Sequence, residues 1–284
     1  MINEGRIYKY VVPERINILE DLQLRITQPK YLNDLFDLAI SFKRLVRKET
    51  YEERMEGKVG KLLTKFYDNI YHKTNFNMND ELKKRGVKEG DLDNLFKLFF
   101  TEEHSELKNG LKDGINKSFG VLSFTESYDN VPMWAHYTNL YQGFVLILNS
   151  NHKFFNRGLI DDTQMGYLEQ VKYVEKKKGW DSLEELHHNL KEIFFEKQDG
   201  WKNEKEWRMI LPLEIANEKR YPDIFLIDIP SDLIIGVIFG FNCSNNLIEY
   251  VKELKEEELE HLELYKAIPN LDEYKMDIIK LNDK

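Results

Sequence analysis

Two short stretches of the sequence collect residue types that could do chemistry. The first, residues 123–137, brings hydroxyl groups, acids, a Trp, a His and a Tyr together between apolar segments. Core segments rarely carry so many polar tips, because each buried one needs a hydrogen-bond partner. A polar loop that joins two strands is a common place for a binding or catalytic site. Residues 123–137 are therefore the first candidate for function.

The second stretch, residues 201–211, has charged residues at every other position before it becomes apolar. In a β-strand, Glu204, Glu206 and Arg208 share one face, because side chains alternate with a period of two. Two carboxylates and a guanidinium on one face are unusual for a surface strand. The pattern predicts either a functional face or a cross-strand ladder of ion pairs, and the sequence leaves both open.

Several single residues have both a structural and a functional interpretation. His136 is either a structural hydrogen-bonding residue or a catalyst. Trp134 either fills the core or stacks on an adenine or nicotinamide ring. The first expected strand contains Tyr8 and Tyr10, which point the same way. They either pack against a helix or line a cleft. Helix capping and ligand binding are both open for a later polar cluster, made of Asn33, Asp34 and Asp37.

Composition limits the class of protein. The chain has 284 residues, of which 42% are hydrophobic and 13% aromatic, enough for one large core. Its formal net charge of -9 and pI near 5.4 argue against general binding to nucleic acids or anionic membranes. The single cysteine, Cys243, excludes an internal disulfide and a cysteine-rich zinc site.

Missing motifs and segments narrow the function further. There is no phosphate-binding P-loop, no dinucleotide-binding glycine fingerprint and no hydrolase nucleophile elbow. No apolar stretch approaches the length of a membrane span, and the first residues lack the apolar core of a signal peptide. We therefore expect a cytoplasmic protein without a bound metal.

The order of the expected elements is mixed, which predicts an α+β fold with a mixed or antiparallel β core and flanking helices. We expect a single domain over residues 1–284 that contains a charged helical insertion at 38–117. A helix is expected at 182–196, where Ser182 and Glu185 form a capping box, and another at 245–258. Strands are expected at 7–12, 24–28, 120–124, 144–148, 171–174, 205–213, 223–229, 234–240 and 273–280.

An ordered set of segments carries a resemblance to a known family. Together these segments resemble the bacterial domain-of-unknown-function family 2971 over most of the chain, with 38–117 as a variable insertion. The segments are Ile7–Tyr10, Pro29–Asp37, Ser123–Glu126, Met133–Tyr137, Gly143–Phe144, Glu204–Arg208 and Ile234–Gly240. The order of strands also has a more distant likeness to ADP-ribosyltransferase folds. In that comparison Lys9, Tyr10 and Val11 stand where some relatives carry His-Tyr-Thr.

The distant likeness implies NAD as the substrate. Breaking the nicotinamide–ribose bond develops an oxocarbenium cation, which a carboxylate must stabilise. The resemblance implies that an aromatic ring stacks on nicotinamide, that Ser123 or Thr125 supports the glutamate, and that Arg208 holds the pyrophosphate or pairs with Glu204. The residues expected in catalysis are Glu206, Glu204 and His136. The residues expected to bind the ligand are Tyr8, Lys9, Tyr10, Asn33, Asp34, Ser123, Trp134, Tyr137 and Arg208.

Three functions remain open. The first is an ADP-ribosyltransferase-like enzyme that transfers or hydrolyses NAD, as an effector in bacterial stress or phage defence. The second is a non-enzymatic sensor or adaptor that binds a protein partner through acidic helices at 38–117 and 245–260. The third is a metal-dependent nuclease with oxygen ligands for Mg²⁺ from Asp34, Asp37, Glu204 and Glu206.

Overall fold

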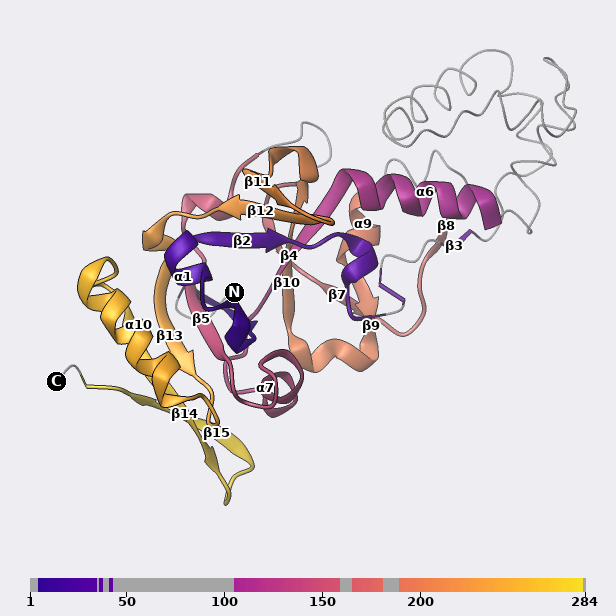
Figure 1. Cartoon of the computed structure of the whole chain (residues 1–284). Helices are drawn as coiled ribbons and strands as arrows, with labels where there is room; N and C mark the ends of the chain where they lie inside the picture. Colours follow the sequence, from indigo (N-terminus) through magenta and orange to yellow (C-terminus); the bar gives the residue numbers. More distant parts are fainter. Residues whose placement is uncertain are drawn as a thin grey trace, which may run out of the picture.

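The computed structural model describes residues 5–34, 36–37, 41–42, 105–158, 165–180 and 189–282. These residues form an α+β fold in which helices flank a central sheet, as the sequence predicts (Figure 1).

An eight-stranded sheet is the centre of the fold, with the strand order β15-β14-β13-β5-β1-β4-β10-β6. Neighbouring strands are antiparallel except β13 and β14, which are parallel and are connected through helix α10. The sheet is therefore mixed. Its strands are β1 (Arg6–Val11), β4 (Phe119–Thr125), β5 (Phe144–Asn149), β6 (Leu168–Gln170), β10 (Glu206–Pro212), β13 (Ile234–Phe239), β14 (Glu263–Asn270) and β15 (Lys275–Lys280).

Smaller sheets and helices complete the described part of the chain. A three-stranded sheet consists of β11 (Glu218–Arg220), β12 (Ile224–Asp228) and β2 (Gln23–Ile26). Strand β3 (Ser41–Phe42) pairs with β8 (Gly179–Trp180). Strand β7 (Lys172–Val174) pairs with β9 (Glu196–Gln198). The α-helices are α1 (Ile18–Asp21), α6 (Ser105–Ser118), α7 (Val131–Tyr137), α9 (Leu190–Phe195) and α10 (Asn245–Glu257). The 3-10 turns are η2 (Pro13–Arg15), η3 (Pro29–Tyr31), η4 (Lys153–Phe155), η5 (Asp199–Glu204), η6 (Leu213–Ile215) and η7 (Ser231–Leu233).

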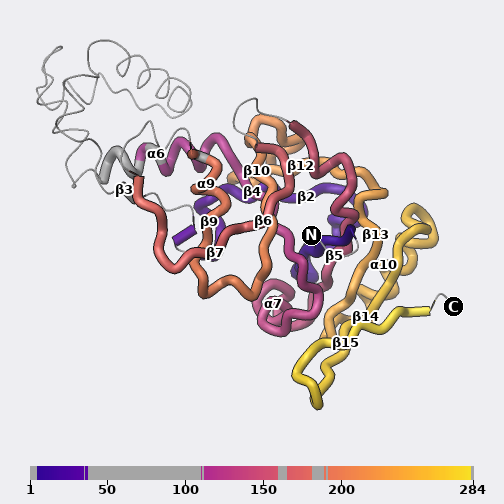
Figure 2. Tube along the Cα trace, turned by 180° about the vertical axis from the view of Figure 1, so that it is seen from behind, coloured from indigo at the N-terminus to yellow at the C-terminus, as the bar shows by residue number. Residues whose placement is uncertain are grey.

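The two faces of the main sheet bury different clusters, because side chains alternate along each strand. Ile7 of β1 belongs to the larger core, together with Val251 of α10. The next residue, Tyr8, belongs to a second cluster with Trp134 of α7. Figures 1 and 2 show α10 alongside β13 and the β14–β15 hairpin extending away from the body. Helices α7 and α10 thus serve opposite faces of the sheet.

Strands β1 and β4 are neighbours over only a short distance. Strand β1 pairs with β5 from Arg6 to Val11, but with β4 only where Tyr8 meets Thr125. Further along, β4 is met by β2 through the bridge between Thr27 and Val121. The separation of β1 from β4 beyond Tyr8 opens the sheet at the place where the candidate site lies.

Most of the strands expected from the sequence are present, and three expectations need correction. Residues 131–137 form helix α7 and not an irregular loop, since Pro132 stands in the first turn and the Asn130 side chain accepts a hydrogen bond from the Met133 backbone N–H at 3.1 Å. Strand β14 was not predicted. Glu204 ends the 3-10 turn η5, and Lys205 with φ of 46° separates it from β10, so Glu204 is not a strand residue.

Some sequence predictions fall outside the described residues. Of the expected insertion at 38–117, the structure describes residues 41–42 and 105–117, and the latter are helical as predicted. The capping box of Ser182 and Glu185 lies outside the described residues. Within 182–196, residues 190–195 are helical, and residue 196 already begins β9. The helix expected at 245–258 is confirmed as α10.

Candidate functional site

A cleft of about 240 Å³ lies where β1, β4 and β10 come together. Its walls are drawn from residues 8–37, 123–137 and 197–208, so three distant stretches of sequence build one hollow. Register across the sheet explains this convergence: Tyr8 is opposite Thr125, and Thr125 is opposite Glu206. Residues that face each other across neighbouring strands share a face. Tyr8, Thr125 and Glu206 therefore form one row.

Most of the side chains singled out in the sequence line this cleft. They are Tyr8, Lys9, Tyr10, Asn33, Ser123, Tyr137, Glu204, Glu206 and Arg208. The remaining three do not line it. Trp134 is fully buried and donates from its indole N–H to the Tyr128 carbonyl at 2.9 Å, while His136 is exposed on α7. Asp34 is buried and accepts from the Phe36 backbone N–H at 2.9 Å, within a turn and not at the start of a helix.

The floor of the cleft is acidic and is organised by one lysine. Lys197 of β9 places its Nζ 2.6 Å from Glu204 Oε2 and 2.9 Å from Glu206 Oε2. Its side chain is only 3% exposed. Burial alone would lower the pKa of Lys197, but the two carboxylates raise it, so the ammonium stays charged. Sequence reasoning missed Lys197, although a charged pair, Glu196 and Lys197, directly after the apolar residues 193–195 was a signal for it.

Arg208 holds the other side of the floor. Its Nε lies 2.7 Å from Glu206 Oε1, and its two terminal nitrogens bind Asp37 at 2.9 and 2.5 Å. The Phe194 carbonyl accepts a further hydrogen bond at 2.8 Å. The expected pairing of Arg208 with Glu204 is therefore wrong, because the guanidinium binds Glu206 and Asp37. Although burial would raise the pKa of Glu206, Arg208 and Lys197 hold it at about 2.

Two hydroxyl groups hold Glu204, the second glutamate of the floor. The Tyr137 hydroxyl donates to Glu204 Oε1 at 2.5 Å and accepts from the Asn33 amide at 2.5 Å. Thr125 donates from its hydroxyl to the Glu204 carbonyl at 2.5 Å. This is the support that the sequence assigned to Ser123 or Thr125, and it reaches the backbone of Glu204. Burial and the charge of Glu204 both raise the pKa of Tyr137, which keeps its phenol protonated.

Lys9 enters the cleft from β1. Because β1 and β4 have separated there, the Lys9 ammonium donates to the Ser123 carbonyl at 2.9 Å, a carbonyl that a closed ladder would pair with a backbone N–H. The ammonium also lies 5.3 Å from the centre of the Phe124 ring. Burial and the positive charge of Arg15 lower the pKa of Lys9 to about 8, against a smaller raising effect of Glu206.

The charged side chains of the cleft balance one another in number. Three cations, Lys9, Lys197 and Arg208, line it together with three carboxylates, those of Asp37, Glu204 and Glu206. Every oxygen of the two glutamate side chains already accepts a hydrogen bond. In the described part of the chain, no group of three or more His, Cys, Asp or Glu side chains is arranged to hold a metal ion. The arrangement favours a ligand that brings positive charge or hydroxyl groups to the floor.

The fold and the cleft define an α+β protein with a small, charged ligand-binding cleft in its central sheet. Compared with protein families, residues 133–209 match the family described as "Protein of unknown function (DUF2971)". The matched stretch runs from α7 into β10 and contains Tyr137, Glu204, Glu206 and Arg208. Neither the curated proteins nor the solved structures provide a match. None of these comparisons supports the distant likeness to ADP-ribosyltransferase folds.

No described helix has the length and apolarity that crossing a membrane requires. The acidic helix α10 buries Val251 and Leu254 in the core and leaves Glu249 and Glu253 exposed.

Proposed function

We propose that the cleft binds the nicotinamide–ribose end of NAD and that the protein cleaves the bond between them, as an ADP-ribosyltransferase or an NAD glycohydrolase. The observation that supports the proposal is the ionised carboxylate of Glu206 in the floor of a cleft that also has an aromatic wall. The nicotinamide ring of NAD is a flat cation, and Tyr8, Tyr10 and Tyr137 offer aromatic surfaces to it.

The size of the cleft suits one end of the dinucleotide. Sites that enclose a drug-sized ligand usually measure about 300–1,000 Å³. The cleft, at about 240 Å³, has room for the nicotinamide ring and part of its ribose. The diphosphate and adenosine would then lie at the mouth. This placement puts the reacting glycosidic bond next to the floor.

Glu206 is the residue we propose for stabilising the transition state. When the C–N bond breaks, nicotinamide leaves with the electron pair and the ribose develops positive charge. An ionised carboxylate stabilises that charge, and Lys197 and Arg208 keep Glu206 ionised. Water completes a hydrolysis, and a nucleophilic side chain of another protein completes a transfer. By consuming NAD in cells, such an enzyme would suit an effector in stress or phage defence.

The second candidate is a non-enzymatic binding protein. It is favoured by the hydrogen bonds that already occupy each carboxylate oxygen of Glu204 and Glu206. A glutamate held in this way has a structural role until a ligand displaces Lys197 or Arg208. A nuclease receives less support, since Asp34 lies outside the cleft and both Asp37 and Glu206 bind Arg208.

Incubating the purified protein with NAD, while nicotinamide release and thermal unfolding are measured, separates the two candidates. An enzyme releases nicotinamide, and Glu206→Gln abolishes the release. Glu218→Gln is the matched control, because Glu218 lies on β11 and pairs with Arg220 outside the cleft. Circular dichroism must show that the variant is folded; if it is not, Tyr10→Ala tests the aromatic wall instead. If the protein releases no nicotinamide and NAD causes no thermal shift, the proposal is overturned and the binding protein is favoured.

A further inference from the structure

One cation of β2, Arg25, lies next to a wall of the cleft. Leu24 and Ile26 of this strand are buried in the core, so Arg25 projects from the opposite face. Thr27, two residues on, lines the cleft. The Arg25 side chain therefore lies on the same side of the extended chain as Thr27, which is part of the cleft wall.

Arg25 also contacts the cleft wall directly. Its guanidinium carbon lies 5.3 Å from the centre of the Tyr31 ring, and Tyr31 lines the cleft. The Arg25 Nε is buried and has no hydrogen-bond partner in the described part of the protein. A buried N–H group without a partner is costly. The position of Arg25 therefore calls for an acceptor that the described residues do not supply.

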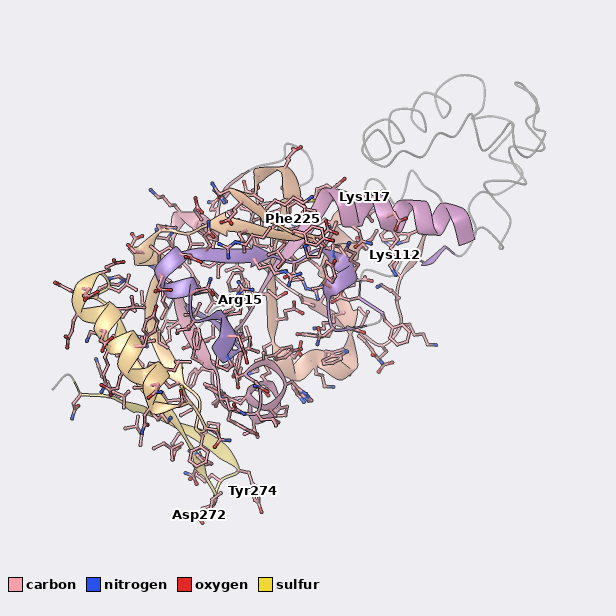
Figure 3. The ribbon with its side chains drawn as sticks, in the orientation of Figure 1. Arg15, Lys112, Lys117, Phe225, Asp272 and Tyr274 are labelled. Atoms are coloured by element: carbon pink, nitrogen blue, oxygen red, sulfur yellow. The ribbon has the colours of Figure 1, made fainter. Side chains whose placement is uncertain are left out.

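The charge of Arg25 acts on Arg15, as does the charge of one acid, Asp21. Figure 3 shows Arg15 near β1 and β2. Burial lowers the pKa of Arg15, and the charges of Arg25 and Arg220 lower it further, while the charge of Asp21 raises it. Arg220 is neutralised by Glu218 at 2.6 Å. Among the residues that the structure describes, neither the Arg15 nor the Arg25 side chain makes a hydrogen bond or an ion pair.

Lys9 joins this group from inside the cleft. Its ammonium has a backbone carbonyl, that of Ser123, as its hydrogen-bond partner, and the charge of Arg15 acts on it. The charges of Glu206 and Asp21 act on Lys9 and Arg15, but in the described part of the chain none of the three cations forms an ion pair with a carboxylate. An anion bound beside them would supply that partner.

We propose that Lys9, Arg15 and Arg25 bind the phosphate group of a ligand whose aromatic part occupies the cleft. Planar guanidinium groups and a lysine ammonium are the side chains that hold phosphate oxygens through charge-assisted hydrogen bonds. The inference rests on the proposed function only in that the cleft takes a ligand, and it does not require that NAD is cleaved. The cleft would then have an acidic floor for a cationic or hydroxyl-bearing part and a basic mouth for phosphate.

Phenyl phosphate is a suitable probe because it joins one aromatic ring to one phosphate, and inorganic phosphate is the matching probe without the ring. Titration calorimetry on the full chain is expected to show tighter binding of phenyl phosphate than of inorganic phosphate. The double variant Arg15→Gln/Arg25→Gln is expected to weaken phenyl phosphate binding at least about tenfold. The control Lys153→Gln/Arg157→Gln removes the same charge from an exposed segment and should leave binding unchanged.

Proton uptake provides a second measurement. The groups whose charges act on Lys9 are Arg15 and Glu206. A bound phosphate adds negative charge and raises the pKa of Lys9, so the protein takes up a proton on binding at pH 8.5. A phosphate ester with a second pKa of about 6 is already doubly ionised there and contributes none. Calorimetry in two buffers of different ionisation enthalpy measures the uptake, which Lys9→Met should remove.

The outcomes separate this inference from the proposed function. Phenyl phosphate binding that depends on Arg15 and Arg25 supports the phosphate site even when the protein releases no nicotinamide from NAD. Binding that is equally weakened by the control pair, or that survives the Arg15/Arg25 variant unchanged, overturns it. If neither phenyl phosphate nor inorganic phosphate binds, the inference is also overturned, whatever the result with NAD.

Discussion

Arg208 and Asp37 are joined by two parallel hydrogen bonds of 2.9 and 2.5 Å although 171 residues separate them in the sequence. Both side chains are 1% exposed. This pair ties strand β10 to the segment that follows η3, and so it closes the cleft between the beginning and the last third of the chain.

Removing the acid of this pair should destabilise the protein strongly. Asp37→Asn leaves the Arg208 guanidinium buried with one carboxylate fewer, and breaking one side of a buried pair costs about 3–5 kcal/mol. Asp199→Asn is the control, because Asp199 pairs with Lys202 at the surface, where a pair contributes about 0–1 kcal/mol. Urea unfolding measures both. Equal losses in the two variants would contradict a structural role for Asp37.

Glu206 should make the stability of the fold depend on pH in the acid range. Its pKa is about 2 in the folded protein and has a reference value of 4.5. A carboxyl group with a depressed folded pKa stabilises fully above its unfolded pKa and loses that effect as pH falls towards the folded value. The difference in unfolding free energy between wild type and Glu206→Gln should therefore be constant above about pH 5.5. It should shrink between pH 4.5 and 2, as urea unfolding at several pH values would show. A difference that grew in acid would be incompatible with this pairing.

Lys9 should react with acylating reagents at a lower pH than other lysines. The neutral amine is the nucleophile, and the pKa of Lys9 is lowered from 10.5 to about 8. Brief acetylation at a series of pH values, followed by peptide mass spectrometry, should give a midpoint near pH 8 for Lys9. Exposed Lys153 is the internal reference. In Arg15→Gln the Lys9 midpoint should rise, because a neighbouring positive charge is gone; an unchanged midpoint would exclude the coupling.

Gly143 should not tolerate a methyl group. A Cβ there would lie 2.1 Å from the Val11 carbonyl oxygen, where the chain from α7 enters β5 beside β1. Overpacking of this kind costs about 1–3 kcal/mol, so Gly143→Ala should lower the melting temperature by several degrees. Gly200→Ala is the matched control, since the nearest atom to its Cβ lies at 4.0 Å in a flexible side chain. A melting temperature equal to that of the control would show that the backbone moves aside.

The sequence predicted those parts of the site that lie on strongly patterned strands. Tyr8, Ser123 and Glu206 are polar tips within apolar or β-branched runs, and the sheet brings their strands together. Lys197 was missed because it directly follows a segment that was assigned to a helix at 182–196, and strand β9, which holds it, was not expected. The exchange of partners by β4, from β1 to β2, was also beyond prediction, since pairing between distant strands has no local signal.

Two elements show why other parts of the fold were missed. Helix α7 has only seven residues, too few for a helical period to be recognised, although Pro132 near its start was a usable sign. Strand β14 contains Pro269 and lacks a regular alternation of polar and apolar residues, and both features argue against a strand in the sequence. Both lie where tertiary packing outweighs local preference.

The order in which the cleft's walls occur in the chain has a consequence during synthesis. A ribosome makes the tyrosines of β1 first and Glu206 of β10 only after about two hundred further residues. A nascent chain that ends before β10 has the aromatic wall but lacks Glu206 and Arg208 of the floor. The complete cleft therefore forms only when translation is well into its final third.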